Sequence, residues 1–149
     1  MRKIILIIAL IMLLAAGCST AAQDAAARAA DDEWGIAFSA ENVTPTGLKL
    51  VCTQAGGHPS GELSTGSPFV LEYTDGEEWK TVELDEDIAW TMEAWLIPLN
   101  ETTEWEINWQ WLYGELPGGR YRIGKAVNDF RAPGDYDTKM YYAQFDIMD

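Results

Sequence analysis

The sequence is poor in the residues from which catalytic and metal sites are most often built. It has one histidine, His58, and two cysteines in 149 residues. A nucleophile needs an activating base, and the chain has no Gly-x-Ser-x-Gly turn. His58 lies between glycines and a proline and has no companion ligands, so we expect an exposed loop residue rather than a catalytic or metal-binding one. We therefore expect no enzymatic activity, no metal and no cofactor.

Basic residues are also scarce, with 10 Lys and Arg against 24 Asp and Glu and a formal net charge of −14. Removal of residues 1–17 would take away Arg2 and Lys3, leaving 8 basic and 24 acidic residues and a charge of −16. Because phosphate contacts need a basic face, nucleic-acid binding is disfavoured. An acidic domain is also repelled by anionic lipid, so we expect it to stand off a membrane surface.

Long apolar runs are confined to the N-terminus. Arg2 and Lys3 precede a run from Ile4 to about Ala16, which is short for a membrane-spanning helix and is typical of a secretory signal. The run ends in Leu-Ala-Ala-Gly-Cys18, which resembles the lipobox of bacterial lipoproteins. The resemblance implies cleavage before Cys18, a lipid on its sulfur, and an exported protein held at the cell membrane with its domain on the extracytoplasmic side. The alternative is an ordinary cleavage site beside an incidental cysteine.

The expected organisation is a lipoprotein signal peptide at 1–17, a lipidated cysteine and flexible tether at 18–33, and one domain at 34–149. The alanine-rich stretch 19–33 has no large apolar residue, and isolated helices of this length are marginal. A flexible or partly helical tether is therefore favoured over a short docked helix. With Cys18 lipidated, Cys52 has no disulfide partner, and its phase with neighbouring leucines predicts a buried, inert thiol.

Strict alternation of apolar and polar residues dominates the rest of the chain. Residues 103–111 predict a half-buried strand, then a Pro-Gly-Gly corner, then a second strand from Tyr121 to Val127, which together read as a central hairpin. Other strands are expected at 36–40, 47–54, 69–73, 79–84, 88–98 and 141–147, with loops at 55–68 and 128–139. The first strand of the hairpin should place four residues in the core: Trp105, Ile107, Trp109 and Trp111.

Seven to nine short strands with turn signals between them predict an all-β fold, an antiparallel immunoglobulin-like β-sandwich. Such sandwiches often carry a corner tyrosine whose hydroxyl bonds back to the backbone, and Tyr121 fits that position. The run Trp-Leu-Tyr-Gly114 followed by Leu-Pro-x-Gly-x-Tyr121-Arg-Ile is similar to a bacterial immunoglobulin-like domain. The similarity covers about 36–147, with domains of this type found in small lipoproteins and at the ends of larger exported proteins. It implies a β-sandwich displayed outside the cytoplasm and no catalytic residues.

Trp90 and Trp95 are five residues apart, so an unbroken strand would place them on opposite faces. One would then be exposed and, with Glu93 beside it, would form a contact surface for a sugar ring or a partner protein. A bulge that buries both rings is the alternative.

The pattern therefore favours a displayed binding or adhesion module on a lipid anchor. One alternative is an accessory or structural subunit docked on a membrane-protein partner, such as a transporter or sensor. A carboxylate-dependent hydrolase is the weaker alternative, because the strand carboxylates alternate as a solvated face does. The acidic stretches 85–87 and 135–137 could supply oxygen ligands for calcium, but solvated corners are expected at both.

Overall fold

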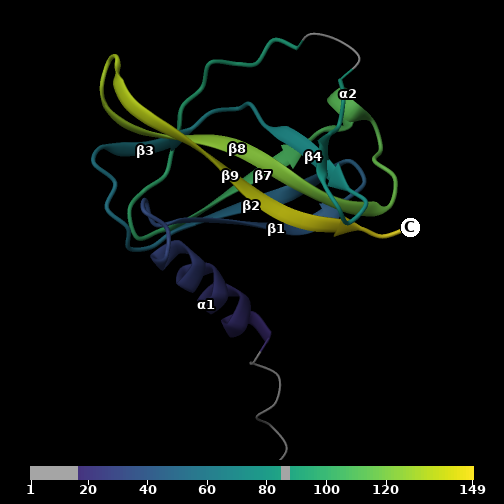
Figure 1. Ribbon diagram of the computed structural model, residues 1–149, viewed down its shortest axis with the longest axis horizontal. Helices are drawn as coiled ribbons and strands as arrows, with labels where there is room; N and C mark the ends of the chain where they lie inside the picture. Colours follow the sequence, from purple (N-terminus) through teal and green to yellow (C-terminus); the bar gives the residue numbers. More distant parts are fainter. Residues whose placement is uncertain (1–16, 85–87) are drawn as a thin grey trace, which may run out of the picture.

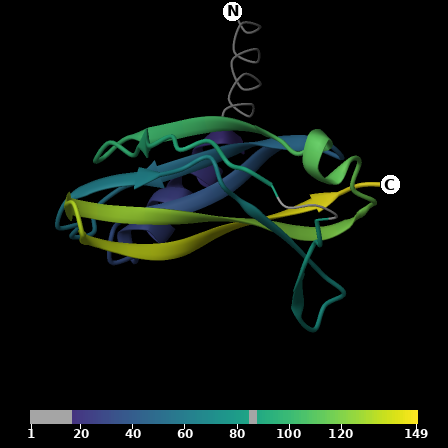
Figure 2. The same ribbon diagram turned by 90° about the horizontal axis from the view of Figure 1, so that it is seen from above.

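The computed structural model describes residues 17–84 and 88–149. The predicted signal peptide, apart from its last residue, and the acidic stretch 85–87 lie outside the described residues. Within these ranges the chain forms nine strands and two helices, and the strands build two antiparallel sheets (Figure 1). Figure 2 shows the sheets as two facing layers. The predicted all-β, immunoglobulin-like sandwich is therefore confirmed.

The smaller sheet has three strands in the order β1-β2-β7. These strands are β1 (Ile36–Thr44), β2 (Gly47–Gln54) and β7 (Thr102–Asn108). Their register places Leu50 between Ala40 on β1 and Trp105 on β7. Among the described residues, strand β7 pairs only with β2, so it forms one edge of this sheet.

The larger sheet is built around β8 (Gly119–Ala132). One side of β8 pairs first with β4 (Val70–Thr74) and then with β3 (Glu62–Thr65), and its other side pairs with β9 (Asp135–Ile147). The short strands β5 (Trp79–Thr81) and β6 (Trp95–Leu96) extend the sheet beyond β4 and β3. Alternating residues of both sheets meet between the layers, which is the burial that period-two patterns predict.

The predicted central hairpin was wrong, because β7 and β8 belong to different sheets. The ladder of β7 ends at Asn108, and a four-residue helix, α2 (Gln110–Tyr113), follows before the chain crosses to the other layer. Trp109 is still fully buried, but the helical turn rotates Trp111 outward, where it is 66% exposed. The expectation that Trp111 is a core residue was therefore wrong, whereas Trp105 is half-buried against the core.

Two predicted loops and one predicted strand also differ from the structure. The stretch 55–68 contains β3, and 128–139 forms the paired ends of β8 and β9, which close at Ala132 and Asp135. Gly134 takes a positive φ of 79° in the turn between them, a conformation that glycine adopts without strain. Of the predicted strand 88–98, only Trp95–Leu96 pairs with a neighbour. Polar composition hid the first two: β3 pairs with a strand that lies far along the chain, whereas residues 128–139 pair with each other as a hairpin.

The predicted flexible tether is instead a docked helix, α1 (Gly17–Ala30). Ala25 and Ala29 are buried, and α1 contacts β1 and β2. Ala37 and Val51, which alternate with the inward residues of those strands, are buried on the opposite face of the sheet. No helix in the described part of the chain has the length and apolar character needed to span a membrane.

Candidate functional site

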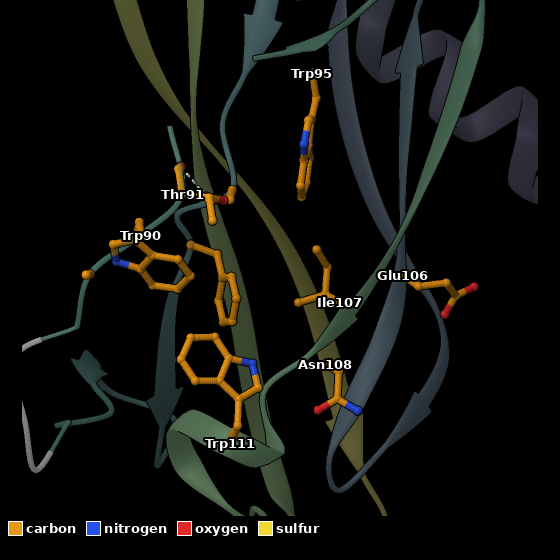
Figure 3. A pocket seen from close by; sticks show the side chains of 10 residues that line it. Trp90, Thr91, Trp95, Glu106, Ile107, Asn108 and Trp111 are labelled. Carbon is orange, nitrogen blue, oxygen red and sulfur yellow. Dashed lines mark hydrogen bonds between the residues drawn. The ribbon is translucent and has the colours of Figure 1, made fainter. Parts of the chain in front are cut away.

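A pocket opens at one side of the sandwich, between the edge strand β7 and the chain that leads into β6 (Figure 3). Its volume is about 200 Å³. Four stretches of the chain meet there: the β3–β4 connection, the residues before β6, the end of β7, and α2. We call it the aromatic pocket, and its lining residues are Ser67, Phe69, Ala89, Trp90, Thr91, Trp95, Glu106, Ile107, Asn108 and Trp111.

Edge-to-face aromatic contacts form the outer wall of the aromatic pocket. The Trp90 ring centroid lies 5.2 Å from that of Phe69, with an interplanar angle of 66°. It lies 6.2 Å from the centroid of Trp111, at 69°. Such perpendicular pairs are a favoured aromatic geometry. Trp90 is half-buried, so the exposed indole of Trp111 is held in place by a ring that is itself packed on the core.

Trp95 forms the inner end of the aromatic pocket and is held on three sides. Its ring centroid lies 5.7 Å from that of Trp105, and its indole N–H donates to Glu93 Oε2 at 3.2 Å. Behind it, Lys125 Nζ lies 4.5 Å from the ring centroid, within cation–π distance. Trp95 is therefore fixed by packing and by its own polar atom.

Lys125 is fully buried, at the inward-facing position that the alternation of its strand predicts. Its ammonium donates to the carbonyl oxygens of Gly66 at 2.5 Å and Pro68 at 3.1 Å. Burial lowers the pKa of Lys125 to about 8, because the charged form loses hydration. The lysine thus ties β8 to the β3–β4 connection, the segment that carries Ser67 and Phe69 into the aromatic pocket.

Neutral polar groups complete the lining. Ser67 Oγ donates to the carbonyl oxygen of Thr91 at 2.8 Å, and Thr91 Oγ1 donates to Ser67 Oγ at 3.0 Å. Asn108 Oδ1 accepts from the backbone N–H of Gln110 at 2.9 Å, which starts the turn into α2. The carboxylate of Glu106 points away from the indoles, on the far side of β7 (Figure 3).

The structure brings the predicted contact residues Trp90 and Trp95 together in one pocket. Both are half-buried and packed against the core, so the argument that opposite faces would expose one of them was wrong. Its premise fails because residues 88–94 form no strand. Glu93 does not line the pocket but bonds to Trp95. Sequence reasoning missed Trp111 and Asn108, although an asparagine that can cap a turn was a signal that the alternation stops at 108.

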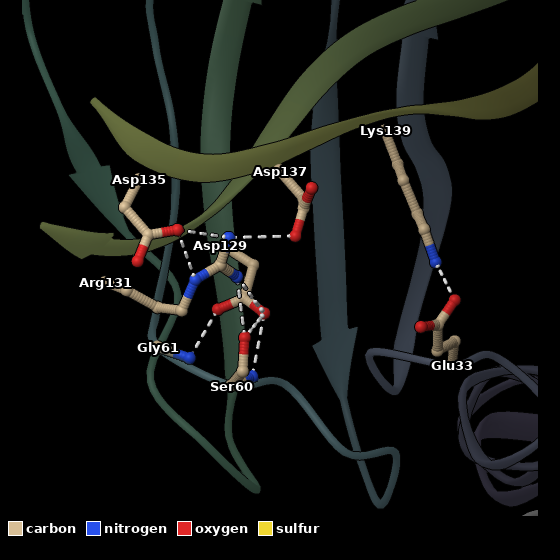
Figure 4. A network of polar contacts seen from close by, with 8 residues as sticks. All are labelled: Glu33, Ser60, Gly61, Asp129, Arg131, Asp135, Asp137 and Lys139. Carbon is tan, nitrogen blue, oxygen red and sulfur yellow. Dashed lines mark hydrogen bonds and ion pairs between the residues drawn. The ribbon is translucent and has the colours of Figure 1, made fainter.

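A second polar cluster lies at the far end of the β8–β9 hairpin (Figure 4). Arg131 pairs with Asp135 and Asp137 at 2.9 and 3.0 Å, so both carboxylates of the stretch 135–137 share one arginine partner. Burial opposes ionisation of Asp129, but hydrogen bonds from Ser60 and Gly61 and the charge of Arg131 outweigh it and hold its pKa low. The described residues contain no group of three or more side chains suited to a metal ion.

The other predicted positions agree with the structure. His58 is exposed, and Cys52 is a free, buried thiol whose pKa burial raises to about 12. The hydroxyl of Tyr121 donates to the carbonyl oxygen of Pro117 at 2.8 Å, as expected of a corner tyrosine. Its ring stacks on Phe145 at 5.7 Å, and Trp109 stacks on the same ring at the same distance. These aromatic residues belong to the scaffold rather than to the pocket.

The fold and the pocket can be set against known families. The profile of the bacterial Ig-like domain matches residues 32–146. No curated protein and no solved structure matches the chain. The matched range begins just before β1, ends within β9, and includes every lining residue of the aromatic pocket. The chain therefore belongs to the bacterial Ig-like domain family.

Proposed function

We propose that the protein is a membrane-anchored extracytoplasmic lipoprotein whose Ig-like domain is a non-catalytic binding module, with the aromatic pocket as its contact surface. The observation that carries this proposal is the state of Trp111. This residue leaves two-thirds of its surface in water while packed edge-to-face against Trp90. A large exposed aromatic side chain in a rigid setting adds little to a scaffold but suits a contact surface.

The position of α1 supports display of the pocket away from a membrane. In Figure 1, α1 lies below the sandwich, whereas α2, which carries Trp111, lies at the top. Cys18 is the second residue of α1. A lipid on Cys18 would hold the α1 side toward the membrane and leave the pocket on the opposite side.

Contacts at the end of α1 make this arrangement rigid. Asp32 Oδ2 accepts hydrogen bonds from the backbone N–H groups of Trp34 and Ile36 at 3.0 and 3.1 Å, and from the hydroxyl of Tyr141 at 2.8 Å. Burial and the bond to Asp32 raise the pKa of Tyr141. An ion pair between Glu33 and Lys139 adds a second link to β9 (Figure 4). The anchor segment is thus fastened to both sheets.

An accessory subunit docked on a membrane protein is the second candidate, and the outer face of the larger sheet favours it. Val70, Met140 and Tyr142 are exposed there and lie close together across β4, β8 and β9. Arg122 stacks between Trp79 and Tyr142, at 4.6 and 4.0 Å from their ring centroids. None of these residues lines the aromatic pocket, so this second surface is separate from it.

The anchor is tested by fractionating bacteria that express the unsubstituted protein, Cys18→Ser or Cys52→Ala, with and without a lipoprotein signal-peptidase inhibitor. We expect only Cys18→Ser to lose acylation and membrane retention, because a buried thiol is not a lipidation site. Cys52→Ala is the matched control. Equal membrane retention of Cys18→Ser and the unsubstituted protein would disprove the anchor.

The contact surface is tested by capturing ligands from native membranes and cell-wall material with Trp111→Ala and Trp79→Ala variants. The proposed function predicts that Trp111→Ala loses the ligand and that Trp79→Ala keeps it. The opposite result would favour docking through the outer face of the larger sheet. Equal capture by both variants and the unsubstituted protein would exclude both surfaces.

A further inference from the structure

We propose that the aromatic pocket binds a neutral carbohydrate, with one pyranose ring of a glycan seated in the corner that Trp90 and Trp111 form. This inference rests on the proposed binding role and names its ligand class. Three properties of the lining lead to it: its shape, its hydrogen-bonding groups and its charge.

The shape suits a single ring. Trp90 and Trp111 meet at 69°, so they form a corner rather than a flat platform. A pyranose has an apolar C–H face that can lie on one indole while its edge meets the other. A volume of about 200 Å³ is below the range typical of drug-sized ligands, and it admits one sugar ring of a longer chain that continues into solvent.

The hydrogen-bonding groups are those that recognise hydroxyls. The indole N–H group of Trp111 has no hydrogen-bond partner among the described residues, whereas the nitrogens of Trp90 and Asn108 point away from Trp111 (Figure 3). In Figure 3 the Trp111 nitrogen faces the side of the pocket where Ile107 and Asn108 lie. Ser67 and Thr91 add hydroxyl oxygens at the opposite rim. Neutral donors and acceptors around an apolar floor match a sugar, which carries both kinds of surface.

The charges argue for a neutral ligand. Glu106 is the one charged residue among the described residues that line the pocket, and its carboxylate points away from the indoles (Figure 3). Glu93 is bonded to Trp95, and Lys125 is buried behind the same ring and bonded to two carbonyl oxygens. No lining group is therefore placed to pair with a cation or an anion. The formal charge of −14 further disfavours acidic glycans.

The experiment is calorimetric titration of the full chain, in a detergent without a sugar headgroup. The probes are cellohexaose and chitohexaose as neutral glycans, polygalacturonate as an acidic glycan, and a lysine-rich peptide as a cationic ligand. We expect at least one neutral glycan to bind, with an affinity that stays the same when NaCl is raised from about 0.1 to about 1 M. Salt at these concentrations screens the attraction of a charged ligand but leaves the binding of a neutral ligand unaffected. Trp111→Ala should weaken that binding at least tenfold, and Trp111→Phe should restore most of it.

Trp79→Ala is the matched control, because it removes an indole from the outer face of the larger sheet and should leave affinity unchanged. Unaltered thermal unfolding of Trp111→Ala excludes misfolding as the cause of a loss. Binding that survives Trp111→Ala, or binding of the charged probes alone, would overturn the inference. A protein partner captured in a Trp111-dependent way, with no neutral glycan bound, would overturn the ligand class but leave the binding module intact. If no ligand of either kind binds in a way that depends on Trp111, both the carbohydrate inference and the proposed binding module are overturned.

Discussion

Trp109 and Trp111 are two residues apart and share the same alternating pattern, but they lie in opposite environments. Trp109 is fully buried, its indole N–H donates to the carbonyl oxygen of Pro45 at 2.8 Å, and its ring stacks on Phe145. Trp111 is mostly exposed and meets Trp90 edge-to-face. The difference shows that period two predicts a common face only as far as the ladder continues, and here the ladder ends at Asn108.

The same contrast separates two groups of aromatic residues in the molecule. In the scaffold, the rings of Trp109 and Tyr121 both stack on the ring of Phe145. The indole N–H of Trp109 and the hydroxyl of Tyr121 each donate to a backbone carbonyl oxygen. In the aromatic pocket, Trp90 and Trp111 are not fully buried, and neither indole nitrogen has a hydrogen-bond partner within the described part of the chain. Scaffold aromatics should therefore dominate stability and pocket aromatics should dominate binding, and the predictions below test that separation.

The largest effect is expected for Trp109→Ala, which should lower the free energy of unfolding by about 3 to 5 kcal/mol. The substitution removes a fully buried indole that packs between the layers, and it takes away one of the two donors to the Pro45 carbonyl oxygen, leaving the backbone N–H of Leu116 as the other. Denaturant unfolding followed by circular dichroism measures the change. A loss below about 1 kcal/mol, the size usual for surface sites, would place Trp109 with the pocket residues rather than the scaffold.

The second prediction concerns Lys125, which links the scaffold to the pocket. Its folded pKa of about 8 lies below its ordinary value of 10.5. Between these values the unfolded chain binds a proton that the folded chain does not, so this residue makes stability rise with pH. Each pKa unit corresponds to about 1.4 kcal/mol, which predicts a rise of about 2 kcal/mol from pH 8 to 9.5.

Lys125→Met, which keeps the length of the side chain, should abolish this rise. The quantity to compare is the difference between the variant and the unsubstituted protein, because other groups titrate in the opposite sense. Burial raises the pKa values of Cys52 and Tyr121, so folding retains their protons and their contribution to stability falls as alkaline pH increases. Parallel stability curves for the two proteins would show that Lys125 keeps an ordinary pKa despite its burial.

Tyr121→Phe tests the scaffold through a single atom and should cost about 1 to 3 kcal/mol. It removes the hydroxyl that donates to the Pro117 carbonyl and keeps the ring that stacks on Phe145. Tyr142→Phe is a suitable control, since its ring lies on the solvent-facing side of the same sheet. Equal unfolding midpoints for both variants would mean that the corner hydroxyl contributes no more than an exposed one.

Local pattern was sufficient where burial alternates along one strand. β2 was predicted at 47–54 and spans Gly47–Gln54, with Leu48, Leu50 and Cys52 all facing the core. The corner position of Tyr121 also followed from its local sequence. In each case the residue's environment is set by the strand on which it lies.

Pattern was insufficient where the environment comes from distant parts of the chain. The alanines of α1 were interpreted as a tether because their burial comes from contacts with β1 and β2, which lie later in the sequence. The polar ends of β8 and β9 read as a loop because Asp129 is satisfied by Ser60 and Gly61, some 70 residues earlier. The aromatic pocket could not be predicted as a whole, because four separated segments form it and one of them, α2, interrupts the expected alternation.

The smallest effect on stability is expected at Trp111, where the comparison with Trp109 is sharpest. Trp111→Ala removes the same side chain from a position two residues away, but the residue is 66% exposed and its aromatic contact is with Trp90, which is itself half-buried. We expect a loss of less than about 1 kcal/mol, as for surface sites. The measurement is the same denaturant titration used for Trp109→Ala, so the two losses of unfolding free energy can be compared directly. A loss above about 3 kcal/mol would show that Trp111 supports the fold, and its exposure would then no longer argue for a contact surface. A small loss combined with lost ligand binding would establish that this indole is held outward for recognition, since the scaffold does not need it.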